Sequence, residues 1–172
     1  HSKLDYCNSL FLNLPQSQLN RLQLILNSSA RAVSKSPKFC HITPLLKSLH
    51  WLKIDQRIKY KVLSITYKTL QSGQPSYLHS LLNVQSNRST RSSDIITLQR
   101  PSVRSRLKVT DRSFTYYAPV LWNSLPKQLR LPSMHLSLGT PTDSTSLLAL
   151  TSHQFHLKLK LKTFLFDQSF PP

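Results

Sequence analysis

Residues 16–34 read QSQLNRLQLILNSSARAVS, and this stretch carries the clearest helical pattern in the chain. Apolar residues recur in it at steps of three and four positions, which places them on one face of an α-helix. Pro15 and Pro37 flank the stretch, as expected at the two boundaries of a helix. We therefore predict a core-packing helix here. Its apolar face consists of Leu19, Leu22, Leu26, Ala30 and Val33.

A second long helix is predicted further along the chain. Asp55 is a good N-cap residue for it, and Gly73 suits its C-terminal end because glycine readily adopts a positive φ. Apolar residues recur between these two positions at helical spacing, and lysine and arginine occupy the other faces. Short helices are predicted on either side. One begins with Thr43 as the cap and Pro44 as the first helical residue. The other is opened by Pro75 and runs from Tyr77 to Leu82.

The middle of the chain is basic and less regular. Residues 84–94 are polar and basic and read as a loop, and two short strands are predicted at 95–99 and 104–110. Arginine and lysine alternate with apolar residues in the second strand, which gives it one basic side. An aromatic-rich segment follows at 114–125, where Pro119 is expected to begin a helical turn.

The C-terminal part begins with residues rich in Ser, Thr, Pro and Gly, which read as a flexible linker. In the tail, Leu-Lys alternation favours a strand, whereas apolar pairs four positions apart favour a helix. Its length leads us to predict a helix. The fold class is thus mainly α, a small helical domain with a short β-hairpin-like element. We divide the chain into a helical segment at 1–83, a basic and aromatic segment at 84–130, a linker at 131–146 and a C-terminal amphipathic segment at 147–172.

Charge is the strongest functional signal. The 172 residues include 23 Lys and Arg but only 6 acidic residues, all of them Asp, so the formal net charge is +17. Such a chain is expected to bind polyanions through counterion release. Basic residues cluster in the middle of the chain, close to aromatic residues that can stack on unpaired bases. The candidate nucleic-acid-binding residues are Arg88, Arg91, Arg100, Arg104, Arg106, Lys108, Arg112, Tyr116 and Tyr117.

The same composition argues against several enzyme classes. Two glycines are too few for a phosphate-binding loop or a dinucleotide fingerprint, and the scattered Asp residues do not form the carboxylate sets of two-metal sites. Cys40 beside His41 is a poor nucleophile–base pair, because adjacent residues rarely orient each other for catalysis. Cys40, His41 and His50, or His153 and His156, lack a convincing fourth metal ligand. We expect no catalytic residue, no metal, no cofactor and no small-molecule substrate.

Membrane and secretion signals are also missing from the pattern. No apolar run approaches the roughly 18 residues that span a bilayer, and residues 1–15 do not read as a signal peptide. We therefore expect no membrane partner and no secretion. The chain starts at His1 and its single methionine is Met134, so we expect a piece of a longer protein.

Several blocks, in order, resemble the C-terminal part of a non-LTR (LINE-type) retrotransposon reverse transcriptase polyprotein. The most characteristic is APVLWNSLP at 118–126. The others are SKLDYCNSL at 2–10, RLQLILNSSAR at 21–31, HITPLLKSLHWL at 41–52, RIKYK at 57–61, PSYL at 75–78, RSSD at 91–94, DRSF at 111–114, HQFH at 153–156 and FLF at 164–166.

This resemblance implies a thumb and post-thumb region of an RNA-directed DNA polymerase, which is expected to hold template RNA and target DNA. The paired aspartates of the polymerase palm are absent from this chain, so the resemblance carries over no catalytic residue. It implies RNA or DNA as partners with low sequence specificity, together with the rest of the polyprotein if the two are translated together. The resemblance also leads us to expect a nuclear or cytoplasmic location.

Two alternatives remain open at this stage. The chain can instead be a stand-alone helical interaction module that binds an acidic protein. It can also be a decayed remnant without function, because it departs from the family pattern at residues 24–31, 52–54 and Thr110.

Overall fold

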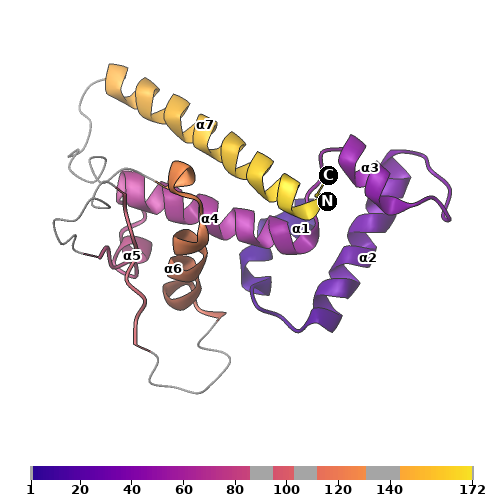
Figure 1. The fold of residues 1–172 in the computed structure, drawn as a ribbon, viewed down its shortest axis with the longest axis horizontal. Coiled ribbons are helices and arrows are strands. Elements are labelled where there is room, and N and C mark those ends of the chain that lie inside the picture. The colour runs from indigo at the N-terminus through magenta and orange to yellow at the C-terminus, as the bar shows by residue number, and fades with distance from the viewer. Residues whose placement is uncertain (1, 86–94, 103–111, 131–143, 172) are drawn as a thin grey trace. The chain divides into compact units, whose positions relative to one another are not determined.

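The computed structural model describes residues 2–85, 95–102, 112–130 and 144–171 (Figure 1). Within these ranges the chain is mainly helical, with seven α-helices, which confirms the predicted fold class. None of the described helices is both long and apolar enough to cross a membrane.

The chain divides into two compact units. Unit 1 combines His1–Lys61 with Leu161–Pro172, and unit 2 is Val62–Lys160. The boundaries fall inside two helices, α4 (Ile54–Ser72) and α7 (Ser144–Ser169). The four segments that composition predicts, with boundaries after residues 83, 130 and 146, stay a prediction.

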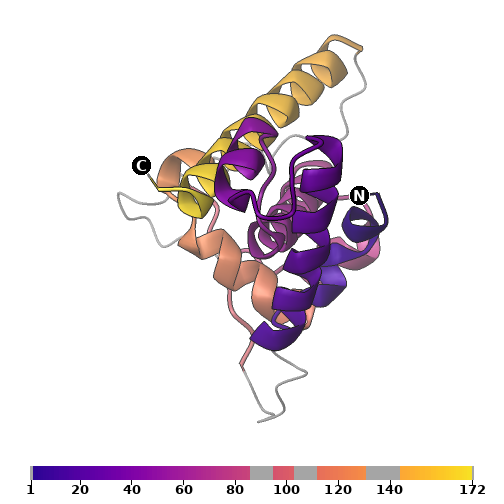
Figure 2. The same ribbon diagram turned by 90° about the vertical axis from the view of Figure 1, so that its right-hand side faces the viewer.

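Unit 1 contains α1 and η1 near the N-terminus, then α2, α3 and the first part of α4, and finally the end of α7. The bounds of its complete elements are Ser2–Tyr6 for α1, Asn8–Phe11 for the 3-10 helix η1, Gln16–Val33 for α2 and Ile42–Ser48 for α3. Helices α2 and α3 pack against each other, as the two ribbon views show (Figures 1 and 2). A small apolar core joins α2, α3 and the C-terminal end of α7, where Phe170 meets Ala30 and Leu46.

The predicted helix at 16–34 is confirmed as α2. On its apolar face, Leu26 and Ala30 are fully buried and Leu19 and Leu22 are half-buried. Val33 is 60% exposed, so the predicted face is wrong at its last position, where the helix ends.

Helices α2 and α3 both end in Schellman motifs that lack glycine. Lys35 follows α2 with φ 50°, and the N–H of Ser36 donates to the carbonyl of Arg31 at 3.0 Å. His50 follows α3 with φ 50°, and the N–H of Trp51 donates to the carbonyl of Leu46 at 2.9 Å. These bonds satisfy carbonyls that have no partner within the helix. The left-handed conformation is unfavourable for a residue with a Cβ atom, so both turns carry local strain.

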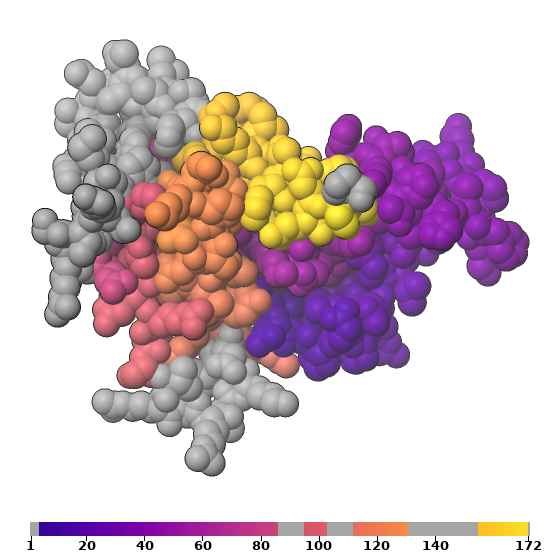
Figure 3. Space-filling view, viewed as in Figure 1, coloured from indigo at the N-terminus to yellow at the C-terminus, as the bar shows by residue number. Residues whose placement is uncertain are grey.

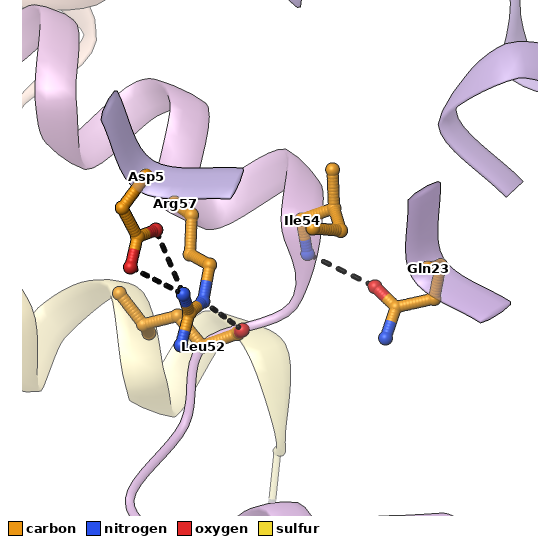
Figure 4. Close-up of polar contacts among 5 residues, drawn as sticks. All are labelled: Asp5, Gln23, Leu52, Ile54 and Arg57. Atoms are coloured by element: carbon orange, nitrogen blue, oxygen red, sulfur yellow. Dashed lines mark hydrogen bonds and ion pairs between the residues drawn. The ribbon is translucent and has the colours of Figure 1, made fainter. Parts of the chain in front are cut away.

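Two of the predicted helix starts are shifted. Helix α3 begins at Ile42, so Thr43 lies inside the helix rather than at its cap. Helix α4 begins at Ile54, which places Asp55 in the first turn, where it forms an ion pair with Lys59. The N–H of Ile54 instead donates to Oε1 of Gln23 at 2.9 Å, so a side chain of α2 caps α4 (Figure 4). A cap supplied from another helix has no local sequence signal.

Unit 2 contains the second part of α4, α5 (Ser76–His79), α6 (Phe114–Ser124), the 3-10 helix η3 (Lys127–Leu129) and the first part of α7. Gly73 has φ +65° at the end of α4, as predicted. Helix α6 begins at Phe114, well before Pro119, so the prediction that Pro119 begins the helical turn is wrong. Pro119 is fully buried inside α6, and this burial offsets the backbone hydrogen bond that proline cannot donate.

The β-like element pairs differently from the sequence pattern. Residues 95–99 pair in an antiparallel manner with 83–85: the N–H of Gln99 donates to the carbonyl of Asn83 at 2.7 Å, and that of Gln85 to Thr97 at 2.9 Å. The sequence pattern places residues 84 and 85 in a loop, so the loop prediction is wrong at its first two positions. The second predicted strand, 104–110, lies outside the described residues.

The predicted C-terminal helix is confirmed as α7. It begins at Ser144 and therefore includes residues 144–146, which composition assigns to the linker. The rest of that linker, 131–143, lies outside the described residues.

Candidate nucleic-acid interface

Five of the nine predicted contact residues lie outside the described residues. They are Arg88, Arg91, Arg104, Arg106 and Lys108. The other four belong to unit 2. Arg100 is exposed, and Arg112 is half-buried with an Nε that has no hydrogen-bond partner among the described residues.

Tyr116 and Tyr117 lie in the first turn of α6, where the carbonyl of Ser113 accepts the backbone N–H of both at 3.1 and 3.0 Å. Both side chains are half-buried, so each presents only part of its ring to solvent. Stacking on a base uses one ring face, and this exposure is compatible with it.

The Trp-Asn pair of the characteristic block has a structural role in unit 2. The side chain of Trp122 is fully buried, and its Nε1 donates to the carbonyl of Ile96 at 2.9 Å. The rings of Trp122 and Tyr67 pack edge-on, with 4.6 Å between their centroids. The amide of Asn123 accepts the N–H of Leu98 at 3.1 Å and donates to the carbonyl of Leu98 at 2.8 Å. We call these three bonds the Trp122–Asn123 clip. It fastens residues 95–99 to α6, and the two segments lie next to each other in Figure 3.

Arg130 hydrogen-bonds to the C-terminal end of α6, next to the Trp122–Asn123 clip. Its Nη2 donates to the carbonyl of Asn123 at 2.7 Å and its Nε to that of Leu125 at 2.9 Å. These are carbonyls at the end of α6, where a cation is also favoured by the helix dipole. Burial raises the pKa of the Tyr67 phenol well above its ordinary value, and the charge of Arg130 partly opposes this rise. Trp122, Asn123 and Arg130 therefore maintain the fold of unit 2.

Unit 1 holds a basic cavity of about 430 Å³, which is within the size range of ligand pockets. We call it the unit 1 cavity. Four segments contribute to it: the N-terminal elements α1 and η1, the loop after α3, the first part of α4, and α7. It is lined by Asp5, Asn8, His50, Trp51, Leu52, Arg57, Tyr60, Lys61 and Lys162.

Arg57 organises this cavity. Its Nη1 contacts both carboxylate oxygens of Asp5, at 2.8 and 2.9 Å, and its Nε donates to the carbonyl of Leu52 at 3.0 Å (Figure 4). Its guanidinium lies 5.6 Å from the centroid of the Trp51 ring. The Arg57 side chain is only 11% exposed, so the ion pair is partly shielded from solvent. Arg57 thus joins α1, the loop after α3 and α4 within unit 1.

The sequence pattern contained only part of this site. The 57–61 block RIKYK carries Arg57, Tyr60 and Lys61 at spacings of three and four, which puts them on one face of a helix. A shared helix face does not by itself predict a binding site. The contribution of Lys162 depends on the tertiary fold, because α7 is distant in sequence.

Metal binding finds no support among the described residues, where no group of three His, Cys or Asp side chains is placed to hold an ion. Comparisons of the chain with protein-family models, with curated proteins and with solved structures find no match.

Proposed function

We propose that this chain is a non-catalytic C-terminal fragment of a LINE-type RNA-directed DNA polymerase that binds RNA and DNA with low sequence specificity. One observation carries the binding proposal: the chain has 23 cationic side chains and 6 carboxylates. Even if every Asp is paired with one cation, most of the Lys and Arg residues have no acidic partner in the chain. Nucleic-acid phosphates are the polyanion that such an excess suits best.

The described ion pairs support this interpretation. Asp5 is engaged by Arg57, and Asp55 by Lys59 at 2.6 Å. Exposed cations on the described surface include Lys38, Lys47, Arg100 and Lys127. Cations that stay hydrated and mobile bind phosphate backbones without reading bases, and the expected specificity is therefore low.

The experiment is a fluorescence-anisotropy titration with two unstructured RNAs of unrelated sequence, a single-stranded DNA and poly-glutamate. We expect the three nucleic acids to bind with similar affinities, and poly-glutamate to bind more weakly. Tight binding of poly-glutamate without binding of nucleic acid would support the alternative of an acidic protein partner. A strong preference for one RNA sequence would contradict the proposed low specificity.

A further inference from the structure

Cationic side chains outnumber carboxylates in the lining of the unit 1 cavity. Three cations and one carboxylate line it, and the carboxylate of Asp5 is held by Arg57 at 2.8 Å. No carboxylate among the described residues forms an ion pair with Lys61 or Lys162. These two lysines come from different helices, α4 and α7, and both line the same cavity. They therefore give the cavity a net attraction for an anion.

The aromatic side chains that line the cavity differ in whether another group already packs on their rings. Arg57 lies over the ring of Trp51, and the ring of His50 packs at 5.9 Å from Phe166. Tyr60 is half-buried on α4, and among the described residues no ring or cation stacks on it. Its ring thus offers an aromatic surface in the cavity, one helical turn from Arg57 and next to Lys61.

A buried polar group completes the lining. Asn8 is 6% exposed, and its Oδ1 has no hydrogen-bond partner among the described residues. Buried polar groups are normally paired, so an unpaired amide oxygen in a cavity wall points to a ligand that donates a hydrogen bond. The cavity therefore combines an aromatic surface, two cations and a hydrogen-bonding amide.

We propose that the unit 1 cavity holds one unpaired nucleotide, with its base stacked on Tyr60 and its flanking phosphates at Lys61 and Lys162. This inference rests on the proposed nucleic-acid binding and adds a preference for single strands. Bases in a duplex are paired and stacked, so they cannot enter a cavity without being flipped out. A single strand presents its bases freely, and stacking tolerates any base sequence.

The first test uses Tyr60→Leu and the matched control Tyr60→Phe, which keeps the ring. The probes are a short oligouridylate and an abasic strand of the same length, because the two carry the same phosphates. We expect Tyr60→Leu to weaken oligouridylate binding by roughly 5- to 150-fold, the effect of losing one stacked base. Binding of the abasic strand should stay unchanged in both variants, and Tyr60→Phe should bind the oligouridylate like the wild type.

The second test separates local contacts from total charge. The double variant Lys61→Gln with Lys162→Gln removes two charges from the cavity, and Lys38→Gln with Lys127→Gln removes two exposed charges elsewhere. We expect the cavity pair to weaken single-strand binding more than the control pair. Duplex binding should fall equally in both, because it depends on charge alone.

Photocrosslinking of a thiouridine-labelled strand to the unaltered chain gives a readout that does not depend on variants folding. We expect crosslinks at the cavity residues of unit 1, and crosslinks confined to unit 2 would overturn the proposal. Equal oligouridylate binding by wild type and a folded Tyr60→Leu would also overturn it, while nucleic-acid binding as such would stand. Failure of the wild type to bind either probe would instead refute the proposed function.

Discussion

Removing the Asn123 amide should destabilise unit 2 by an amount that the structure allows us to estimate. In Asn123→Ala, the N–H and the carbonyl of Leu98 both lose their partner, at 3.1 and 2.8 Å in the wild type. Leu98 is 1% exposed, so water replaces these bonds poorly. Leaving a buried polar group unpaired costs about 1–3 kcal/mol. Because Asn123 itself is half-buried and some water can enter, we expect a total loss of about 2–3 kcal/mol.

The assay is urea unfolding followed by tryptophan fluorescence. A Trp51→Phe background leaves Trp122 as the reporter, so the signal describes unit 2 alone. Ser124→Ala is the matched control on the same helix: its hydroxyl donates to the carbonyl of Leu121 at 2.7 Å, but Ser124 is exposed. We expect this control to change the free energy of unfolding by less than about 0.5 kcal/mol. A loss in Asn123→Ala no larger than in the control would refute the role given to the clip.

Asn123→Asp adds a pH-dependent arm to the same experiment. An ionised Asp can accept the N–H of Leu98 but cannot donate to its carbonyl, whereas a protonated Asp can do both. The folded state should therefore raise the pKa of the new carboxyl above its unfolded value of about 3.9. The contribution of this carboxyl to the free energy of unfolding is then fully present below its unfolded pKa and is lost as pH rises through its folded pKa. Stability that does not decline over this range, relative to Asn123→Ala, would contradict the geometry.

Three further predictions concern other contacts. Trp122→Phe removes the hydrogen bond to the carbonyl of Ile96 and leaves a void, so we expect the free energy of unfolding in urea to fall by about 2–4 kcal/mol. A fall below about 1 kcal/mol would count against this role of Trp122. Lys35→Gly relieves the positive φ of 50° after α2 and should stabilise unit 1 by about 0.5–1 kcal/mol, seen as a higher thermal midpoint; an unchanged or lower midpoint would argue against strain there. Burial raises the pKa of Tyr67, so its contribution to the free energy of unfolding is fully present below the unfolded pKa of about 10 and is lost as pH rises above it. Alkaline titration at 295 nm should therefore show Tyr67 ionising only as unit 2 unfolds. Ionisation of all tyrosines near pH 10 in the folded chain would disprove this prediction.

The helical framework could be predicted from the sequence because its signals are local. The leucine spacing in 16–33 and the glycine at 73 each act within a few residues, and both are confirmed as α2 and the end of α4. The helix starts were less accurate. A side chain of α2, Gln23, caps α4, and burial keeps Pro119 inside α6. Tertiary contacts determine both features, and local propensity contains no record of them.

The sites were harder to predict for the same reason. The net charge predicts a polyanion ligand, and the basic cluster along the sequence lies at 88–112. The structure describes only part of that cluster. The unit 1 cavity is assembled from four separate segments, and Lys162 joins Lys61 only through the fold. Tyr116 and Tyr117 were placed near the basic cluster by sequence distance, and whether they contact nucleic acid stays a prediction.

The proposed function requires that the lysines and arginines without an acidic partner bind phosphates. The measurement is the affinity of the chain for an unstructured single-stranded RNA as a function of KCl concentration. We predict that the logarithm of the association constant falls linearly with the logarithm of salt, with a slope of about −3 or steeper, which corresponds to four or more phosphates at roughly −0.7 per phosphate. A slope near zero, or no binding at low salt, would contradict the proposal that this chain binds nucleic acid through its cationic side chains.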